Sequence, residues 1–281
     1  MFLITLGLMS AMCGASERSS PLSQMNVEGP SGRLFVDDGG AGRQLPAVFI
    51  HSLAGNSTQW APQLRYFRRT RRAVALDLRG HGRSEPPKDA KFGPDAYAAD
   101  VRQVLDALGI QRAVLVGHSL GGGVAVAFAG LWPERAAGLM LVDPIDDPSK
   151  RQADANMEAF LRQLEGSEYE SVITAYWTEI LKFANDSVRE KVLADLRTTP
   201  QATVVGSMRA MGGFNAEAAL ARYSGPIVTI TTPMNEFPSS LHNVVNGIKQ
   251  EKMTGVSHWL HLDRPDEFNV ALDRFLSIVR N

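Results

Sequence analysis

The sequence has little cysteine and no excess of charge of either sign. Its single cysteine, Cys13, excludes a disulfide framework and a metal site built from several thiolates. With 29 basic and 30 acidic residues the net charge is -1, so the electrostatic signature of nucleic-acid or anionic-lipid binding is missing. We interpret the one local cluster of positive charge as the solvated face of a helix end; it comprises Arg65, Arg68, Arg69, Arg71 and Arg72.

Several motifs that bind cofactors or metals are also missing from the sequence. There is no phosphate-binding P-loop, no G-x-G-x-x-G that opens a helix ahead of a distant acid, and no H-E-x-x-H. We therefore expect neither a cofactor nor a catalytic metal ion. The glycine run Gly121 to Gly123 is instead explained by close packing of a helix on a strand.

The chain begins with an apolar segment that is too short for a membrane span. Residues 1–12 are almost entirely apolar and are followed by small residues near Ala15, whereas a spanning helix needs roughly 20 residues. We predict a signal peptide over residues 1–15, export to the periplasm or medium, and no stable membrane insertion. The alternative is a cytoplasmic protein with a later start codon, because no Lys or Arg precedes the apolar stretch and Met9, Met12 and Met25 follow.

Short runs rich in Val, Ile and Leu alternate with helical patterns along most of the chain. This alternation is typical of parallel strands joined by crossover helices. The predicted strands are Pro46–Ile50, Arg72–Leu76, Ala113–Val116, Gly138–Val142 and Ile227–Thr231. The predicted covering helices are Tyr97–Leu108 and Pro265–Val279, where apolar residues recur at helical spacing.

The strand pattern stops for a long stretch near the middle of the chain. Residues 148–222 show only helical periodicity, and α/β pattern flanks them on both sides. We predict an α/β core over 16–147 and 223–281, with 148–222 folded as a cap over the carboxyl edge of the sheet, where ligands of open α/β sheets bind. The alternative is an independent helical domain.

A serine lies in the turn between a predicted strand and a predicted helix. The segment Gly117-His118-Ser119-Leu120-Gly121 follows the strand Ala113–Val116 and precedes the helical run Val124–Leu131. This order of strand, G-x-S-x-G and helix is that of a nucleophile elbow, a tight turn that requires small residues two positions before and after the serine. The pattern indicates Ser119 as a nucleophile.

A serine nucleophile needs an imidazole to accept its proton, and His258 is the best candidate among six histidines. His258 lies in a loop after a short strand-like stretch, Glu251–Met253, and before the last helix. His261 is the nearest competitor. His118 adjoins the serine, but on so sharp a turn we expect its ring to point away from it.

Four segments in this order resemble the α/β-hydrolase superfamily, in the branch of capped esterases and lactonases. They are His51-Ser52-Leu53-Ala54-Gly55-Asn56, Asp77-Leu78-Arg79-Gly80-His81-Gly82-Arg83-Ser84, Gly117 to Gly122, and Gly255 to Pro265. The resemblance implies the α/β-hydrolase fold, with a mostly parallel sheet, helices on both faces and a helical cap. It also implies that the backbone N–H groups of Leu53 and Leu120 form an oxyanion hole and that His51 and His81 are structural.

The acid that would orient the histidine departs from the family pattern. Members usually carry an Asp after the strand that corresponds to Ile227–Thr231, but here that region has Asn235 followed by Glu236. The other placement known in the superfamily is after the strand that follows the nucleophile helix, where this chain has Asp143. Asp143 is our first candidate for the acid, and Glu236 is the alternative. The third possibility is that neither residue is the acid, because an Asp before Pro also makes an ordinary turn.

The residue types favour a particular class of chemistry. A serine nucleophile forms an acyl-enzyme, whereas epoxide hydrolases and dehalogenases of this fold use aspartate there. We predict that the protein cleaves a small apolar ester or lactone in a pocket that includes Trp60 and Trp177, with further cap residues forming an apolar roof; these are Phe160, Phe183, Met208, Met211 and Phe214. The alternatives are the same triad acting on carbon–carbon or amide bonds or in perhydrolysis, and a ligand receptor with negligible turnover.

Overall fold

The computed structural model describes residues 23–151 and 155–280. The proposed signal peptide therefore lies outside the described residues. Within the described part of the chain, no helix is both long enough and apolar enough to cross a membrane.

An eight-stranded sheet forms the centre of the molecule, in the order β1-β2-β4-β3-β5-β6-β7-β8. Strands β3 to β8 pair in parallel, and β1 and β2 form an antiparallel hairpin at one edge. The strands are β1 Ser23–Gly29, β2 Gly32–Gly39, β3 Ala47–Ile50, β4 Ala73–Leu76, β5 Ala113–His118, β6 Ala136–Val142, β7 Ile227–Thr231 and β8 Lys249–Lys252.

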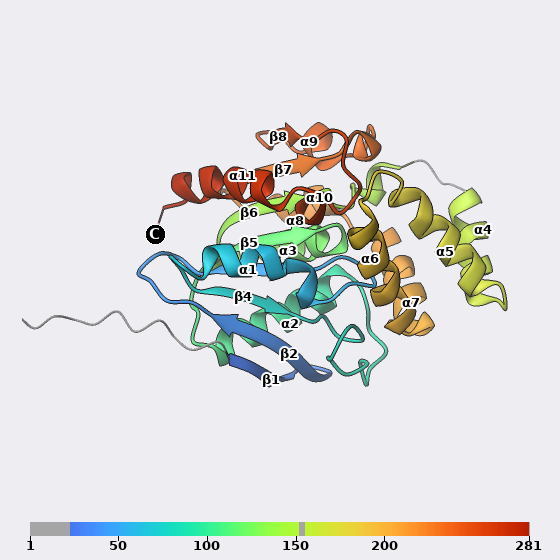
Figure 1. Cartoon of the computed structure of the whole chain (residues 1–281), viewed down its shortest axis with the longest axis horizontal. Helices are drawn as coiled ribbons and strands as arrows, with labels where there is room; N and C mark the ends of the chain where they lie inside the picture. Colours follow the sequence, from blue (N-terminus) through green and yellow to red (C-terminus); the bar gives the residue numbers. More distant parts are fainter. Residues whose placement is uncertain (1–22, 152–154, 281) are drawn as a thin grey trace, which may run out of the picture.

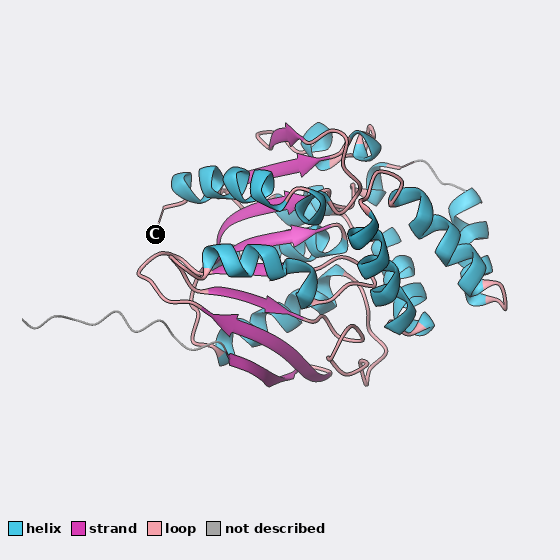
Figure 2. Ribbon diagram, viewed as in Figure 1, coloured by secondary structure: helices cyan, strands magenta, loops and turns pink. Residues whose placement is uncertain are grey.

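Helices cover both faces of this sheet (Figures 1 and 2). Helices α1 and α11 lie in front of it in Figure 1, and α2, α3 and α8 lie behind it. Their bounds are α1 Ala61–Phe67, α2 Pro94–Ala107, α3 Leu120–Leu131, α8 Ala216–Leu220 and α11 Pro265–Ile278. The α/β-hydrolase fold predicted from the sequence is confirmed.

Alternate residues of the central strands enter two separate apolar cores. In β3, Val48 and Ile50 face the core under α2 and α3, whereas Ala47 and Phe49 face the core under α1 and α11. All four side chains are fully buried. Because both faces are covered, the central strands read as continuous apolar runs, which is why the sequence pattern located them.

Helices α4 to α7 stand at the end of the sheet to which the parallel strands point (Figure 1). They lie between β6 and β7 in the chain, within the stretch where the sequence shows only helical periodicity. Their bounds are α4 Ala155–Glu165, α5 Tyr169–Ile180, α6 Asp186–Thr198 and α7 Gln201–Gly212.

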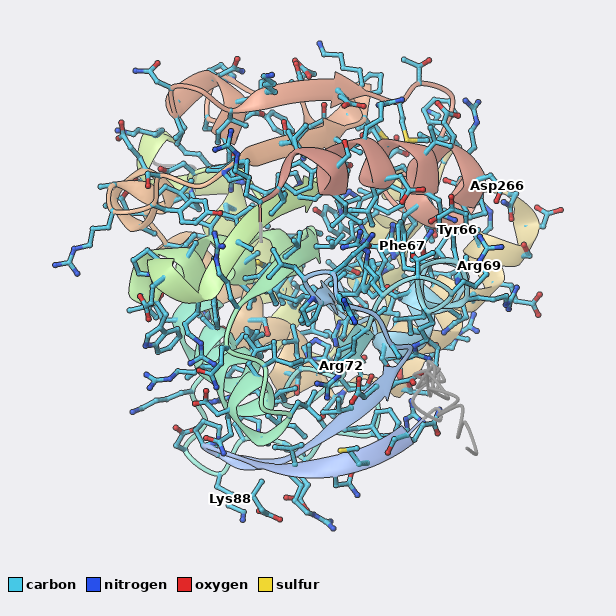
Figure 3. All side chains as sticks on the ribbon, turned by 90° about the vertical axis from the view of Figure 1, so that its left-hand side faces the viewer. Tyr66, Phe67, Arg69, Arg72, Lys88 and Asp266 are labelled. Carbon is cyan, nitrogen blue, oxygen red and sulfur yellow. The ribbon has the colours of Figure 1, made fainter. Side chains whose placement is uncertain are left out.

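Arg69 and Arg72 of the arginine cluster lie at the opposite end, which faces the viewer in Figure 3. Arg65 and Arg69 are exposed, as expected for a solvated helix face, whereas Arg68, Arg71 and Arg72 are more buried than expected. Arg68 forms a 2.7 Å ion pair with Asp37, and Arg72 forms one of the same length with Asp38. The cluster therefore fastens the start of β4 to strand β2.

Candidate active site

Ser119 occupies the turn between β5 and α3 with φ 52° and ψ -115°, a conformation that residues with side chains rarely adopt. Two glycines make this turn possible. A Cβ atom on Gly117 would come within 2.1 Å of the Gly121 carbonyl oxygen, and one on Gly121 within 2.3 Å of the Ile50 carbonyl oxygen. The turn therefore presents the serine at the end of the strand, as the strand–serine–helix pattern predicted.

Backbone strain is concentrated around this turn. Among the described residues other than glycine, four have positive φ: Ala54, Ala90, Ser119 and Asp143. All but Ala90 belong to the loops at the ends of the adjacent strands β3, β5 and β6. Such strain persists where surrounding structure holds it in place, and it gathers at functional sites.

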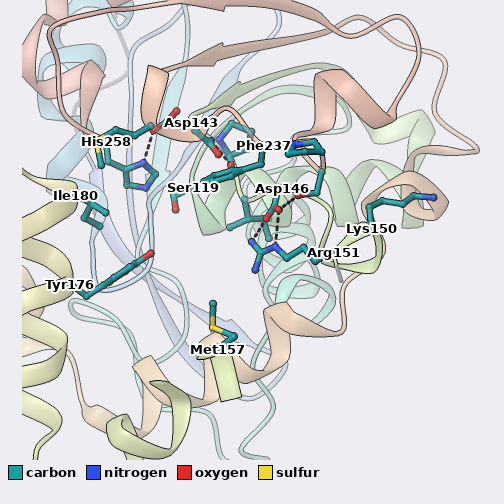
Figure 4. A pocket seen from close by; sticks show the side chains of 16 residues that line it. Ser119, Asp143, Asp146, Lys150, Arg151, Met157, Tyr176, Ile180, Phe237 and His258 are labelled. Carbon is teal, nitrogen blue, oxygen red and sulfur yellow. Dashed lines mark hydrogen bonds and ion pairs between the residues drawn. The ribbon is translucent and has the colours of Figure 1, made fainter. Parts of the chain in front are cut away.

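The His258 ring bonds to Asp143, with 2.6 Å between Nδ1 and a carboxylate oxygen. A carboxylate only accepts hydrogen bonds, so we assign the proton to Nδ1, which leaves Nε2 with a free lone pair. Ser119 and His258 line the same pocket, and Figure 4 shows the serine side chain beside the imidazole ring. The arrangement can pass the serine proton to Nε2 while Asp143 orients the ring.

Asp143 is almost fully buried and is held by the residue that follows β7. The backbone N–H of Thr232 donates to one carboxylate oxygen at 2.8 Å, and its hydroxyl donates to the other at 3.0 Å. Sequence reasoning missed Thr232. The signal that could have indicated it was a hydroxyl side chain at the end of β7, because β7 lies next to β6, the strand that ends at Asp143.

Glu236, the alternative acid, has other partners. It lies near Lys252 at 3.2 Å and His242 at 3.7 Å, and it accepts a hydrogen bond from Gln250. These hydrogen bonds and the lysine charge outweigh slight burial and lower the pKa of the Glu236 carboxyl. The structure thus brings Asp143, and not Glu236, to the histidine.

The two predicted oxyanion donors have no competing partner. No described residue accepts a hydrogen bond from the backbone N–H of Leu53 or Leu120. Leu120 begins α3, where the first-turn N–H groups lack intrahelical acceptors. The loop that carries Leu53 is held by His51, whose Nε2 accepts from the Leu78 N–H at 2.9 Å and whose Nδ1 bonds to the Ser52 carbonyl at 2.7 Å.

Two further histidines pack beneath His258. The Nε2–H of His118 donates to the His258 carbonyl oxygen at 2.9 Å, and the ring centroids of His118 and His258 are 4.6 Å apart. His261 stacks on Trp60 and contacts His118. Burial lowers the pKa of His261 to about 3 and that of His118 well below its ordinary value, so both rings are neutral at pH 7.

Two connected cavities of about 780 Å³ and 400 Å³ meet at Ser119 and His258. The smaller one lies under the α4–α7 helices, and its walls are largely apolar. The expected wall residues that line it are Phe160, Trp177, Met208 and Met211. The larger one also carries polar side chains, among them Asp146 and Arg151 (Figure 4).

Three of the expected pocket residues lie elsewhere. Trp60 is fully buried in the core under α1 and α11, where it packs on Phe49 and His261, because the short helix that carries it turns its ring to that face of the sheet. Phe183 is 55% exposed, and Phe214 lines a separate hollow beside α2. The pocket assignment of Trp60 was wrong.

Comparison with known proteins agrees with this geometry. The profile of the family described as alpha/beta hydrolase fold matches residues 46–229, and the chain belongs to this family. The chain is 40% identical over 116 residues to a 2-hydroxymuconate semialdehyde hydrolase from a Pseudomonas strain. That alignment covers 39% of each of the two chains.

Solved structures resemble nearly the whole fold. An enol-lactonase from Burkholderia xenovorans superposes with a TM-score of 0.78 at 20% identity, covering 90% of this chain and 100% of that one. An N-acyl homoserine lactone degrading enzyme gives a TM-score of 0.76 at 23% identity, covering 89% and 100%. At these identities the likeness concerns the fold. It agrees with the family match, which places the chain in the alpha/beta hydrolase family.

Proposed function

We propose that the protein is a serine hydrolase that cleaves a carboxylic ester or lactone through an acyl-enzyme on Ser119. The observation that carries the proposal is the 2.6 Å bond from His258 Nδ1 to buried Asp143, at a pocket that Ser119 also lines. In this proposal Ser119, His258 and Asp143 are the catalytic triad, and the N–H groups of Leu53 and Leu120 form the oxyanion hole.

The first half of the reaction forms the acyl-enzyme. As Ser119 Oγ attacks the carbonyl carbon, its proton moves to His258 Nε2, and Asp143 stabilises the imidazolium. The carbonyl oxygen becomes an oxyanion that accepts hydrogen bonds from Leu53 and Leu120. The imidazolium then protonates the leaving alkoxide, and the carbon–oxygen bond breaks.

The second half returns the serine. A water molecule loses a proton to His258 Nε2 and attacks the acyl carbon, and the resulting oxyanion uses the same two N–H groups. Collapse of this intermediate expels Ser119 Oγ, which takes its proton back from the imidazolium. With a lactone, the carboxylate and hydroxyl products remain parts of one molecule.

The pocket supports an apolar substrate. Helices α4 to α7, which form most of the predicted cap of residues 148–222, would cover it, because Phe160, Trp177, Met208 and Met211 provide one apolar wall of the smaller cavity, whereas α8 packs on α3 behind the sheet (Figure 1). Its volume of about 400 Å³ suits a small or medium acyl or alkyl group.

The test combines a phosphonate probe with a panel of chromogenic esters and lactones. We expect stoichiometric labelling of the wild type, loss of labelling in Ser119→Ala, and turnover of short apolar esters. Probe labelling without turnover of any ester or lactone would reject this substrate class and favour chemistry at another bond. Labelling that persists in Ser119→Ala would reject the nucleophile.

A further inference from the structure

Gln59 is a buried amide side chain that belongs to neither the nucleophile turn nor the histidine–acid pair. It lies in a short helical turn after β3 and is 1% exposed. Side chains from three separate parts of the chain approach its amide group. Because a buried amide is costly unless both of its ends are hydrogen-bonded, the identity of its partners is informative.

The orientation of the amide follows from the chemistry of its partners. The indole Nε1–H of Trp259 can only donate, and it lies 3.3 Å from Oε1. The carboxylate of Asp195 can only accept, and it lies 2.9 Å from Nε2. Reversing the amide would set donor against donor and acceptor against acceptor, so a single orientation satisfies both.

Asp195 connects Gln59 to the helices over the site. It belongs to α6, is 8% exposed, and holds Lys191 one turn away at 2.6 Å. A buried carboxylate needs such partners to remain charged. The Gln59–Asp195 bond is therefore a polar contact between α6 and the short helical turn that follows β3.

The opposite end of the amide touches both loops that serve the reaction. Trp259 directly follows His258, and the Trp259 ring lies 5.1 Å from the His258 ring. On the other side the amide packs against the loop that carries Leu53, since a Cβ atom on Gly55 would lie 2.6 Å from Oε1. The Ser52 hydroxyl makes a long contact of 3.5 Å with the same oxygen.

We infer that Gln59 is a positioning residue that couples helix α6 to the loops carrying the base His258 and the oxyanion donor Leu53. It acts through Trp259 and the Ser52–Gly55 loop and does not touch the substrate. This inference rests on the proposed function. It predicts that a change at the Gln59–Asp195 contact alters the geometry of both loops together.

The decisive variants exchange donor and acceptor across the contact. Gln59→Glu sets two carboxylates against each other, whereas Asp195→Asn removes the charge of the acceptor but keeps a carbonyl oxygen that can accept from Gln59. The double variant Gln59→Glu with Asp195→Asn restores one donor and one acceptor, conserves the net charge, and still accepts from Trp259. We expect Gln59→Glu to lower kcat more than it changes KM, by roughly tenfold or more, since a displacement of about 1 Å at reacting groups can cost about 100-fold, and we expect Asp195→Asn to have a smaller effect.

The double variant separates coupling from simple loss of stability. We expect its kcat to exceed that of Gln59→Glu by at least about fivefold, as for residues in direct contact. If the double variant is no better than Gln59→Glu, the coupling is wrong. If Gln59→Glu keeps wild-type kcat, Gln59 has no positioning role.

Gln63 provides a matched control for the loss of a buried amide. It is fully buried on α1 and donates to the His261 carbonyl oxygen at 3.0 Å, and among the described residues it has no hydrogen bond to α6. Gln59→Leu and Gln63→Leu are compared by amide hydrogen exchange, each in the full-length protein. We expect faster exchange in 51–56, 186–198 and 256–260 together for Gln59→Leu, and no change in 51–56 or 186–198 for Gln63→Leu.

The exchange measurement requires no turnover, so it distinguishes failure of this inference from failure of the proposed function. If the wild type hydrolyses no ester but Gln59→Leu shows the coupled exchange pattern, the proposed reaction is refuted and the coupling is retained. Equal exchange patterns in the two leucine variants would refute the coupling, whatever the reaction.

Discussion

The ends of two neighbouring strands, β6 and β7, each carry a carboxylate that could orient a histidine, and they differ in every property that matters. Asp143 after β6 is 1% exposed, and it has left-handed backbone with φ 40°. Glu236 after β7 has a side chain that is 32% exposed and is engaged with a lysine. In this chain the β7 end supplies Thr232, which holds the acid, and the β6 end supplies the acid.

The difference shows that the place of an acid depends on geometry rather than on strand number. Strands β6 and β7 pair directly, so their ends lie side by side at one edge of the sheet. A carboxylate at the end of either strand can approach the same histidine loop, and a hydroxyl group at the end of the other strand can hold that carboxylate. Substitutions at Asp143, Thr232 and Glu236 test which residue has which role.

The largest effect is expected for Asp143→Asn. The amide can present an N–H to His258 Nδ1, which selects the wrong tautomer, so kcat should fall by about four orders of magnitude, as in well-studied serine proteases. The measurement is kcat on an activated ester at pH 7, with thermal unfolding to verify the fold. Activity close to wild type would show that Asp143 is not the acid.

A smaller loss is expected for Thr232→Val. The hydroxyl bond at 3.0 Å is removed while the backbone N–H bond to Asp143 remains, so we expect kcat to fall about tenfold, the equivalent of one hydrogen bond to a charged group. Thr229→Val on the same strand is the control, because Thr229 is buried and its hydroxyl contacts only the Lys249 carbonyl at 3.4 Å. Equal losses in the two variants would indicate a general effect on β7.

Glu236→Gln should change kcat by less than about twofold, because a partly exposed ion pair contributes little. The same ester assay gives the measurement. Its chain neighbours Asn235 and Phe237 line the larger cavity, so KM is measured as well. A loss of kcat comparable to that of Asp143→Asn would reverse the assignment of the two carboxylates.

The comparison extends to two nearby histidines, since His258 has a carboxylate partner and His261, in the short helix α10 (Leu260–Asp263), has none among the described residues. Burial, with a smaller contribution from His258, lowers the pKa of His261 to about 3, and neither of its ring nitrogens has a hydrogen-bond partner among the described residues. The unfolded chain binds this proton near pH 6.5. The stability contributed by the neutral ring is therefore complete above pH 6.5 and is lost as the pH falls toward 3.

His261→Phe removes this titration and retains the stacking on Trp60. Between pH 6.5 and pH 5, we expect its free energy of unfolding to fall by about 2 kcal/mol less than that of the wild type. Chemical denaturation at the two pH values measures the difference. Buried His81 and His118 are present in both proteins, so their contributions to the pH dependence of stability cancel in the comparison. Equal changes in the free energy of unfolding of the two proteins between the two pH values would contradict the prediction.

Much of the fold could be predicted because the central strands are buried on both faces and leave an unbroken apolar signal. The β1–β2 hairpin was missed, since β1 has mostly polar residues and only Val27 is buried in it. Helix α1 was anticipated only through the arginine cluster assigned to a helix end, because its seven residues are too few for a clear helical period.

The candidate site could be predicted in part. Ser119 lies in a turn with a strong local signature, and His258 follows from its place before the last helix. The choice between Asp143 and Glu236 depends on a backbone angle and on contacts 89 residues apart in the chain, such as that of Thr232 with Asp143. Trp60 was misplaced because composition does not reveal which face of a sheet an aromatic ring enters.

Trapping of the acyl-enzyme tests the central claim most directly. The protein is mixed with an activated apolar ester, quenched within the first turnover, and digested for mass spectrometry. We predict a mass increase equal to the acyl group on the peptide that contains Ser119, which forms far more slowly in Asp143→Asn. Turnover with no acyl adduct in the wild type, or an adduct on another residue, would contradict the account.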